Sequence, residues 1–162
     1  MKDRWRIAGI SALALTVCAG IAAVLAFTVS PPQEPQDGRA WVLEARRHME
    51  ANRFVEAARA YEHGLAASRK VAGDPLVWCE LADALGMAQG GRLAGKPAEL
   101  VQKALALGPT HPRALEMAGS VAYEAGDHAK AVLYWEQLLA RLPPDSGEYA
   151  QLSAAISRTR AM

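Results

Sequence analysis

Apolar residues recur along much of the chain at the spacing of an α-helix. Phe54, Ala57, Tyr61 and Leu65 follow one another at steps of three or four residues, so they would share one face of a helix. Polar residues fill many of the positions between them, and glycine, proline and asparagine separate one such segment from the next. This pattern predicts an all-α fold built from amphipathic helices.

A longer pattern repeats every 37 residues, from 41 to 78 and from 78 to 115. A large apolar residue begins each copy, at Trp41, Trp78 and Leu115. Four positions later stands a small residue that lets a second helix come close: Ala45, Ala82 and Gly119. A repeated helix pair of roughly this length is typical of the tetratricopeptide repeat, whose usual period is about 34 residues. The sequence therefore predicts an α-solenoid of three helix pairs.

The boundaries of the first predicted helices follow from residues that start or end a helix. The first pair begins near Gly38 and turns at Asn52, because asparagine tolerates the left-handed backbone found at helix ends. Its second helix could continue as far as Lys70. Asp74 can then cap the next helix, and Pro75 fits a first helical turn, where no amide hydrogen is needed.

Glycine, proline and capping residues in the C-terminal half predict a long loop and a final helix. Residues 89–97 contain three glycines and join the two helices of the second pair. This loop is either a docking element or a tolerated insertion, since loops accept extra length at little cost. The third pair turns at Gly126 and stops at Pro143. Asp145 and Glu148 resemble a capping box that opens a last helix, which would close the array with a polar outer side.

The N-terminal part is predicted to be a membrane anchor. The 23 residues from Ile7 to Val29 carry no charge. As a helix they would be about 34 Å long, enough to cross a hydrocarbon core of about 30 Å. Lys2, Arg4 and Arg6 precede them, so the N-terminus should stay cytoplasmic and the rest be translocated. A cleavable signal peptide is the alternative, disfavoured because its apolar core is usually shorter.

The predicted organisation therefore has four parts. Residues 1–6 form a cytoplasmic N-terminus and residues 7–29 the transmembrane anchor. Residues 30–38 form a polar, proline-rich linker. Residues 39–162 form the tetratricopeptide-repeat domain, made of three helix pairs and a capping helix.

Charge and residue inventory exclude several function classes. The net charge is +1, and beyond Val29 there are 15 Lys and Arg against 16 Asp and Glu, so a basic face for nucleic acid is not expected. The chain has no C-x-x-C pair, and therefore no zinc ribbon, thioredoxin-type site or covalent haem attachment site. Four scattered histidines suggest no metal site. We expect a non-catalytic protein without a cofactor, since no nucleophile–base pair is visible.

A stack of helix pairs predicts a partner-binding groove. The first helices of the pairs would line a concave surface. Repeat geometry places nine residues at its exposed positions: Val42, Arg46, Met49, Cys79, Asp83, Met87, Glu116, Ser120 and Tyr123. This mixture of methionine, tyrosine and scattered charge suits an amphipathic helix or an extended peptide.

Three segments give the chain a more specific resemblance. Residues 81–97, 104–115 and 131–139 resemble the repeat-containing subunit of the bacterial c-type cytochrome maturation haem lyase, the CycH/NrfG type. The resemblance is good from Trp78 to Leu142 and only generic from Trp41 to Leu65.

This resemblance implies a function and a location. Family members are membrane-anchored periplasmic chaperones that bind apocytochrome c, notably its C-terminal helix. They present it to the membrane haem lyase subunits, which join haem to its C-x-x-C-H thiols. The chain would thus be a single-pass protein of the bacterial inner membrane, with its C-terminal domain in the periplasm.

Other interpretations remain open beside this one. A general cell-envelope scaffold that joins two membrane proteins would have the same repeats. A clamp for the C-terminal carboxylates of chaperones is disfavoured, because Cys79 and Asp83 occupy the equivalent positions. Cys79 could form a mixed disulfide with a client thiol, but a small half-buried residue is the favoured interpretation. Glu80 and Asp83 would oppose a thiolate there. We expect no intrachain disulfide between Cys18 and Cys79, because a membrane helix would keep them apart.

Overall fold

The computed structural model describes residues 37–162, which fold into eight α-helices with no strand among them. The helices are α2 (Gly38–Glu50), α3 (Phe54–Ala67), α4 (Arg69–Ala72), α5 (Pro75–Ala88), α6 (Lys96–Leu107), α7 (Pro112–Glu124), α8 (His128–Leu139) and α9 (Gly147–Arg160). The predicted anchor at 7–29 lies outside the described residues. Within residues 37–162 no helix has the length and apolar character needed to cross a bilayer.

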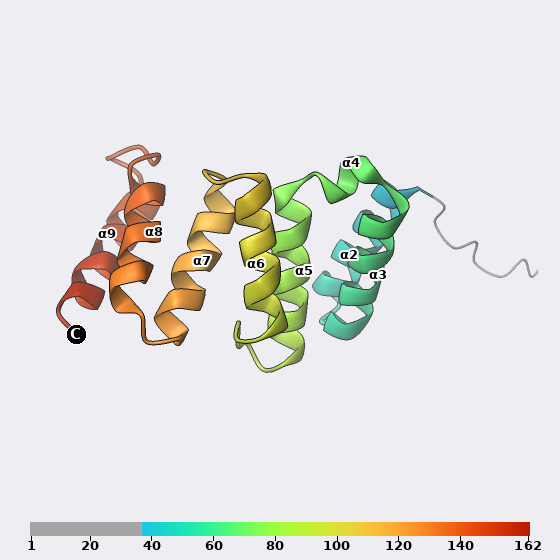
Figure 1. Ribbon diagram of the computed structural model, residues 1–162, viewed down its shortest axis with the longest axis horizontal. Coiled ribbons are helices and arrows are strands. Elements are labelled where there is room, and N and C mark those ends of the chain that lie inside the picture. The colour runs from blue at the N-terminus through green and yellow to red at the C-terminus, as the bar shows by residue number, and fades with distance from the viewer. Residues whose placement is uncertain (1–36) are drawn as a thin grey trace, which may run out of the picture. The chain divides into compact units, whose positions relative to one another are not determined.

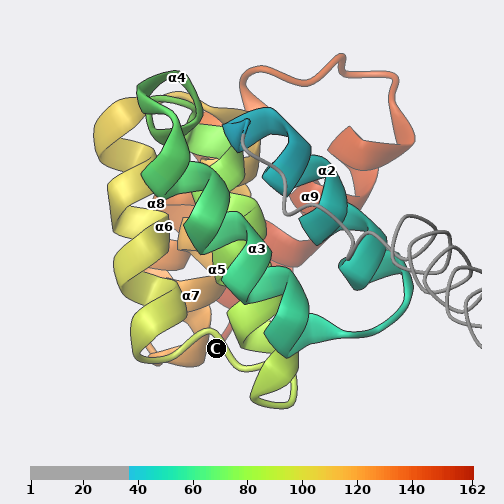
Figure 2. The same ribbon diagram turned by 90° about the vertical axis from the view of Figure 1, so that its right-hand side faces the viewer.

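The helices stack side by side in chain order, as the repeat pattern predicts (Figure 1). The helices form three pairs, and within each pair the two helices pack against each other: α2 with α3, α5 with α6, and α7 with α8. Each pair then contacts the next, through α3 with α5 and α6 with α7, and α9 closes the stack on α8. Figure 2 looks along the stack from its α2–α3 end. The described part of the chain is therefore an all-helical repeat array with a terminal helix.

Small residues allow the close approach of paired helices. Ala45 and Ala82 have no exposed surface, and Ala118 is 1% exposed. A larger core of apolar side chains extends from α2 to α7, and a smaller one joins α8 and α9 around Trp135 and Ile156. Because each layer contributes to the core of its neighbour, no helix pair has to bury its apolar face alone.

Gly119 shows how tight the third pair is. A methyl group added at Gly119 would lie 2.1 Å from Nε1 of Trp135 and 2.3 Å from its Cδ1. The indole of Trp135 therefore occupies the space that a side chain would need, and its N–H donates to the backbone carbonyl of Glu116 at 3.4 Å. The prediction that α7 and α8 pack through this glycine is consistent with that geometry.

Two predicted helix boundaries are confirmed. The carboxylate of Asp74 accepts the backbone N–H of Leu76 at 2.9 Å, so it caps α5, and Pro75 is the first residue of that helix. Asn52 has a φ of 56° and makes the left-handed turn between α2 and α3. Both turns follow the residue preferences that predicted them.

Two other boundaries differ from the prediction. The second helix does not continue to Lys70, because Ser68 takes an extended conformation and caps the separate short helix α4 through its hydroxyl group. The final helix is capped by Ser146 rather than Asp145, since the Ser146 hydroxyl accepts the backbone N–H of Tyr149 at 3.1 Å. In both cases a serine hydroxyl accepts a backbone N–H of the first helical turn.

Candidate functional site

The candidate site is the A-helix face, which we define as the surface of α2, α5 and α7 that carries Arg46, Asp83 and Glu116. These are the first helices of the three pairs. Ion pairs link them. Arg46 on α2 forms two hydrogen bonds to the carboxylate of Glu80 on α5, at 3.0 and 3.2 Å. Arg113 on α7 contacts Asp83 on α5 at 2.6 Å and Glu116 at 2.8 Å.

These ion pairs raise the pKa of both arginines and partly neutralise the face. The hydrogen bond to Glu80 raises the pKa of Arg46. Burial lowers the pKa of Arg113, but its contacts with Glu116 and Asp83 outweigh this effect and raise the pKa overall. Because the pairs are solvent-exposed in part, they contribute little stability. Their main effect is to set the spacing and charge pattern that a partner would meet.

The nine residues predicted to line the groove divide into two groups. Seven reach the surface at least in part: Arg46, Met49, Asp83, Met87, Glu116, Ser120 and Tyr123. Met87 and Tyr123 are the most exposed large apolar side chains among them, at 45% and 39%. Val42 and Cys79 differ from the expectation of exposed positions, because both are buried between helices. Cys79 has no exposed surface, and Val42 keeps only 7%, which borders the hollow beside α4 described below.

The environment of Cys79 makes it an unreactive thiol. Its side chain has no exposed surface, and burial raises its pKa to about 12. The nearby cation Arg113 lowers that pKa only in part, and the acid Asp83 raises it further. The thiolate is the nucleophilic form of cysteine. The structure therefore favours the interpretation of Cys79 as a packing residue over a mixed disulfide.

A hollow of about 560 Å³ lies at the C-terminal end of the A-helix face. We call it the α7–α9 hollow. Its apolar lining comes from the end of α8, the following turn and α9: Leu138, Leu142, Leu152 and Ala155. Arg113, Glu116 and Glu148 provide charge at its edge. An apolar trough with charged edges is suited to the apolar face of an amphipathic helix.

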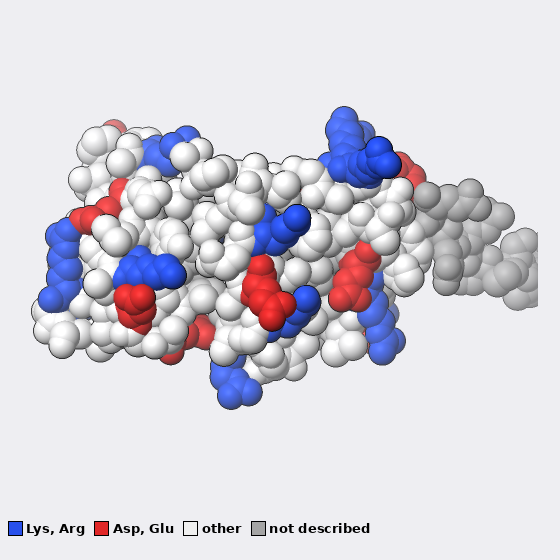
Figure 3. Space-filling view, viewed as in Figure 1, with Lys and Arg blue, Asp and Glu red and all other residues white. Residues whose placement is uncertain are grey.

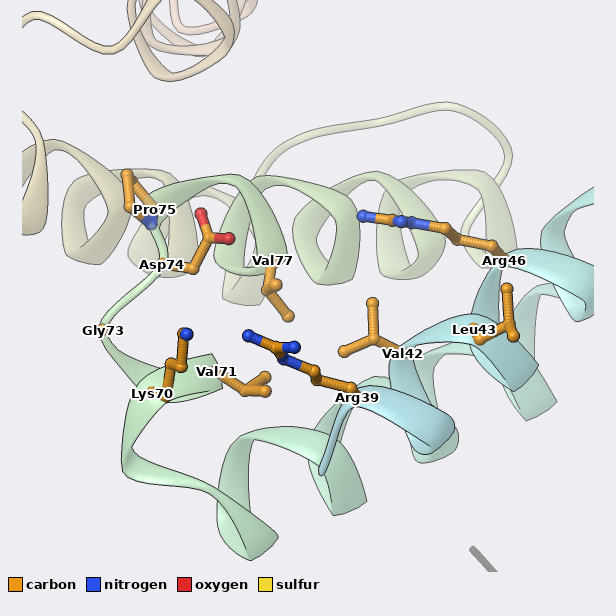
Figure 4. A pocket seen from close by; sticks show the side chains of 10 residues that line it. All are labelled: Arg39, Val42, Leu43, Arg46, Lys70, Val71, Gly73, Asp74, Pro75 and Val77. Carbon is orange, nitrogen blue, oxygen red and sulfur yellow. The ribbon is translucent and has the colours of Figure 1, made fainter. Parts of the chain in front are cut away.

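A second hollow, of about 610 Å³, lies at the other end of the array (Figure 4). We call it the α2–α5 hollow, because α2, α4 and the start of α5 enclose it. Val42, Val71 and Val77 are the buried part of its lining. Arg39, Arg46 and Lys70 contribute cationic groups to it (Figure 4).

Repeat geometry did not predict the residues that complete the two hollows. Arg39 belongs to the first turn of α2, Lys70 to α4, and Leu152 to the terminal helix α9. The sequence-based prediction of the groove includes only residues at repeated positions on the first helix of each pair. Lys70 and Leu152 belong to a connection and a capping helix, which have no equivalent in the other repeats. Arg39 could have been found from its place on the same helical face as Val42 and Arg46.

The loop at residues 89–97 is held by specific hydrogen bonds. The side-chain amide of Gln89 donates to the carbonyls of Arg92 and Ala94. The backbone N–H of Leu93 donates to the carboxylate of Glu124 on α7 at 2.8 Å. The loop thus has a defined conformation anchored to the next repeat. Both a docking element and a tolerated insertion remain compatible with it.

Histidines within residues 37–162 make contacts on separate helices. The ring of His63 stacks on Trp41 at 4.6 Å between centroids, and that of His128 meets Tyr123 edge-on at 5.2 Å. In the described part of the chain, no three His, Cys, Asp or Glu side chains converge as metal ligands would. On the face shown in Figure 3, positive and negative groups alternate, with lysine and arginine gathered over α4. That face presents no continuous basic surface.

Comparison with known proteins identifies a family. The family model described as the cytochrome c-type biogenesis protein H TPR domain matches residues 24–149. The protein named cytochrome c-type biogenesis protein CycH from Pseudomonas aeruginosa is 28% identical over 127 residues, which are 78% of this chain and 30% of that protein. Its namesake from Rhizobium meliloti is 31% identical over 112 residues, 69% of this chain and 29% of that protein. The match thus spans less than a third of the length of these relatives.

Solved structures show the same fold. The first TPR of Spaghetti (RPAP3), bound to the HSP90 peptide SRMEEVD, superposes with a TM-score of 0.64 at 18% identity, covering 80% of this chain and 97% of that one. The Sgt2 TPR domain from Aspergillus fumigatus superposes with a TM-score of 0.62 at 14% identity, covering 80% and 83%. At these identities the likeness establishes the tetratricopeptide-repeat fold.

Proposed function

The chain belongs to the family of the cytochrome c-type biogenesis protein H TPR domain, and from this membership we propose that it binds apocytochrome c and presents it to the membrane haem lyase. The observation that carries the proposal is the family match over residues 24–149, which includes the whole A-helix face. Involvement in c-type cytochrome biogenesis follows from the family. The client and the lyase are our proposal.

The α7–α9 hollow, which adjoins the C-terminal end of the A-helix face, is the part of the array best suited to such a client. Its leucines would bury the apolar stripe of the client's C-terminal helix, while Arg113, Glu116 and Glu148 would meet the polar flanks. Met87 and Tyr123 are further exposed apolar side chains, on α5 and α7. Methionine side chains adapt to differing partner shapes, which suits a protein that holds an unfolded client.

The proposed mechanism is binding without catalysis. Groove binding would hold the apocytochrome in an accessible form, and anchoring at 7–29 would keep it close to the lyase. Tethering raises the effective concentration of the client at the lyase without any new contact. This location, a single span in the bacterial inner membrane with the repeats in the periplasm, is part of the proposal.

Calorimetric titration tests the proposed function. The full chain, in mild detergent, is titrated with a peptide from the C-terminal helix of an apocytochrome c of the same organism. A scrambled peptide and the folded holocytochrome are the controls. We expect micromolar or tighter binding of the native peptide alone, about −8 kcal/mol. Absence of binding to any cytochrome peptide would contradict the proposal and favour a general cell-envelope scaffold.

A matched pair of variants locates the site. Leu142→Gln places a polar group in the α7–α9 hollow, whereas Leu133→Gln makes the same change on α8 at a side chain that is 59% exposed. We expect Leu142→Gln to weaken peptide binding about tenfold, corresponding to loss of one buried apolar anchor. Leu133→Gln should leave it unchanged. Equal affinities of the two variants would exclude the α7–α9 hollow as the client site.

A further inference from the structure

The α2–α5 hollow combines an apolar floor with cationic groups. Its floor consists of Val42, Val71 and Val77, which are 7%, 6% and 4% exposed. Leu43 adds an apolar side chain that is 51% exposed. A small, strongly hydrated anion would gain nothing from these valines. An aliphatic group entering the hollow would gain by losing its contact with water.

The cations of this hollow are not all neutralised. Arg46 is paired with Glu80. Arg39 and Lys70 have no ion-pair partner among residues 37–162. Asp74 is the one acid that lines the hollow, and its carboxylate is already used to cap α5.

The two unpaired cations face the same space. In Figure 4 the head group of Arg39, from α2, extends toward the side of the hollow where that of Lys70, from α4, lies, and both line the same space. Like charges held near each other are unfavourable, and an anion placed between them would relieve that repulsion. Arg39 can also bind a carboxylate with two hydrogen bonds, because its guanidinium is planar.

We propose that the α2–α5 hollow binds an acidic peptide segment of a partner protein through one carboxylate and one adjacent aliphatic side chain. The carboxylate lies between Arg39 and Lys70, and the aliphatic side chain packs on Val42, Val71 and Val77. Charge complementarity selects the acid, and the buried valines select its aliphatic neighbour. The proposal does not rest on apocytochrome binding, which we assign to the opposite end of the array.

Binding of a short model peptide tests this site. The probe is the fluorescently labelled peptide Ala-Glu-Leu-Glu-Ala with blocked ends, and the control peptide carries Gln in place of both Glu. Fluorescence anisotropy with the full chain should show binding of the acidic probe, at least about tenfold tighter than the Gln peptide, since charge-assisted hydrogen bonds are lost with the carboxylates. Equal binding of the two peptides would overturn the proposal.

Two pairs of variants separate the charged and apolar halves of the site. Arg39→Gln with Lys70→Gln removes the free cations, and Arg59→Gln with Lys130→Gln removes the same charge from exposed positions elsewhere. We expect about tenfold weaker binding in the first double variant only. Leu43→Ala should also weaken binding severalfold, while Leu133→Ala should not. An effect of total charge alone, equal in both double variants, would overturn the proposal.

Competition distinguishes a peptide site from a simple anion site. Inorganic phosphate is titrated against the bound probe at constant ionic strength. We expect displacement only at concentrations far above those of unlabelled peptide, because phosphate cannot use the valine floor. Displacement by phosphate as readily as by peptide would overturn the proposal. Titration of the Arg39→Gln, Lys70→Gln variant with the apocytochrome peptide tests the proposed function separately. Failure of one proposal can then be told from failure of the other.

Discussion

At the scale of single residues, the packing of Gly119 against Trp135 limits what the third repeat can accept. Gly119→Ala should destabilise the protein by about 1–3 kcal/mol, because the added methyl group would overlap the indole and force the helices apart. This figure is the net effect, after the gain in helix propensity of about 1 kcal/mol has been subtracted. Urea unfolding followed by circular dichroism measures the change.

The control for this change is Gly147→Ala. An added methyl group at Gly147 would have no neighbouring atom within 4 Å, so this variant should be neutral or slightly stabilising. A similar urea midpoint for both variants would mean that α7 and α8 do not pack as described.

The buried thiol of Cys79 should be protected in the native protein. In a Cys18→Ser background, we expect alkylation by iodoacetamide at pH 8 to be about a hundredfold slower than in urea, because reaction requires local opening. The folded pKa of about 12 lies above the ordinary value of 9.0. The neutral thiol therefore contributes stability that is full below pH 9 and is lost as pH rises toward 12. Rapid native labelling would contradict its burial.

At this scale, the sequence predicts a role correctly where the role depends on the residue's own conformational or capping preference. Asn52 and Asp74 act through their own backbone or side chain, so their roles could be predicted. The burial of Val42 and Cys79 could not be predicted from the sequence. Helical periodicity gives the direction in which a side chain points, but not how closely the next pair approaches that side of the helix. Neighbouring elements cover both side chains.

At the scale of helices, capping side chains set where each element begins. Asp127 accepts the backbone N–H of Lys130 at 3.1 Å at the start of α8. Asp127→Ala should destabilise the protein by about 1 kcal/mol, because this N–H loses its partner. Asp127→Asn, which keeps an acceptor oxygen, should retain most of the stability. Thermal melting compares the two, and equal losses would show that charge rather than capping is responsible.

The element that sequence analysis missed is α4. The apolar pattern of α3 continues through Val71, which is buried, so one longer helix was a reasonable expectation. Ser68 breaks the helix because its hydroxyl can cap a new turn. A capping interaction of this kind competes with helix continuation by a small free-energy difference, which a pattern of apolar positions does not resolve.

At the scale of the whole repeat array, the two cores predict unequal stability along the stack. The larger core involves α2 to α7, whereas α8 and α9 depend on the smaller one around Trp135. Native-state hydrogen exchange should therefore show opening of α8 and α9 at a lower free energy than opening of α5. Ile156→Ala, at a residue that is 3% exposed, should lower protection in α8 and α9 and leave α3 unchanged.

The opposite result is informative as well. If Ile156→Ala lowers protection in α3 as much as in α9, the array unfolds as one cooperative unit. The additive description of neighbouring repeats would then be wrong for this protein.

The candidate site shows the limit of repeat-based prediction for the whole array. Three helix pairs and a terminal helix could be predicted because they recur or punctuate the chain. Both hollows lie beside elements that do not recur: α4, between the first and second pairs, and α9, after the third pair. The shape of each hollow depends on how two non-equivalent elements pack together. A repeated sequence pattern does not contain that information.

The position of the hollows at the two ends of the array has a mechanical consequence. Each helix pair contacts only its neighbours, so small rotations at successive contacts add up from one end to the other. The array can therefore flex like a short spring. The distance between its two ends is the dimension that changes at the lowest cost in free energy. A partner long enough to occupy both hollows would set the curvature of the spring by its own length, and a partner that fills one would leave the spring relaxed.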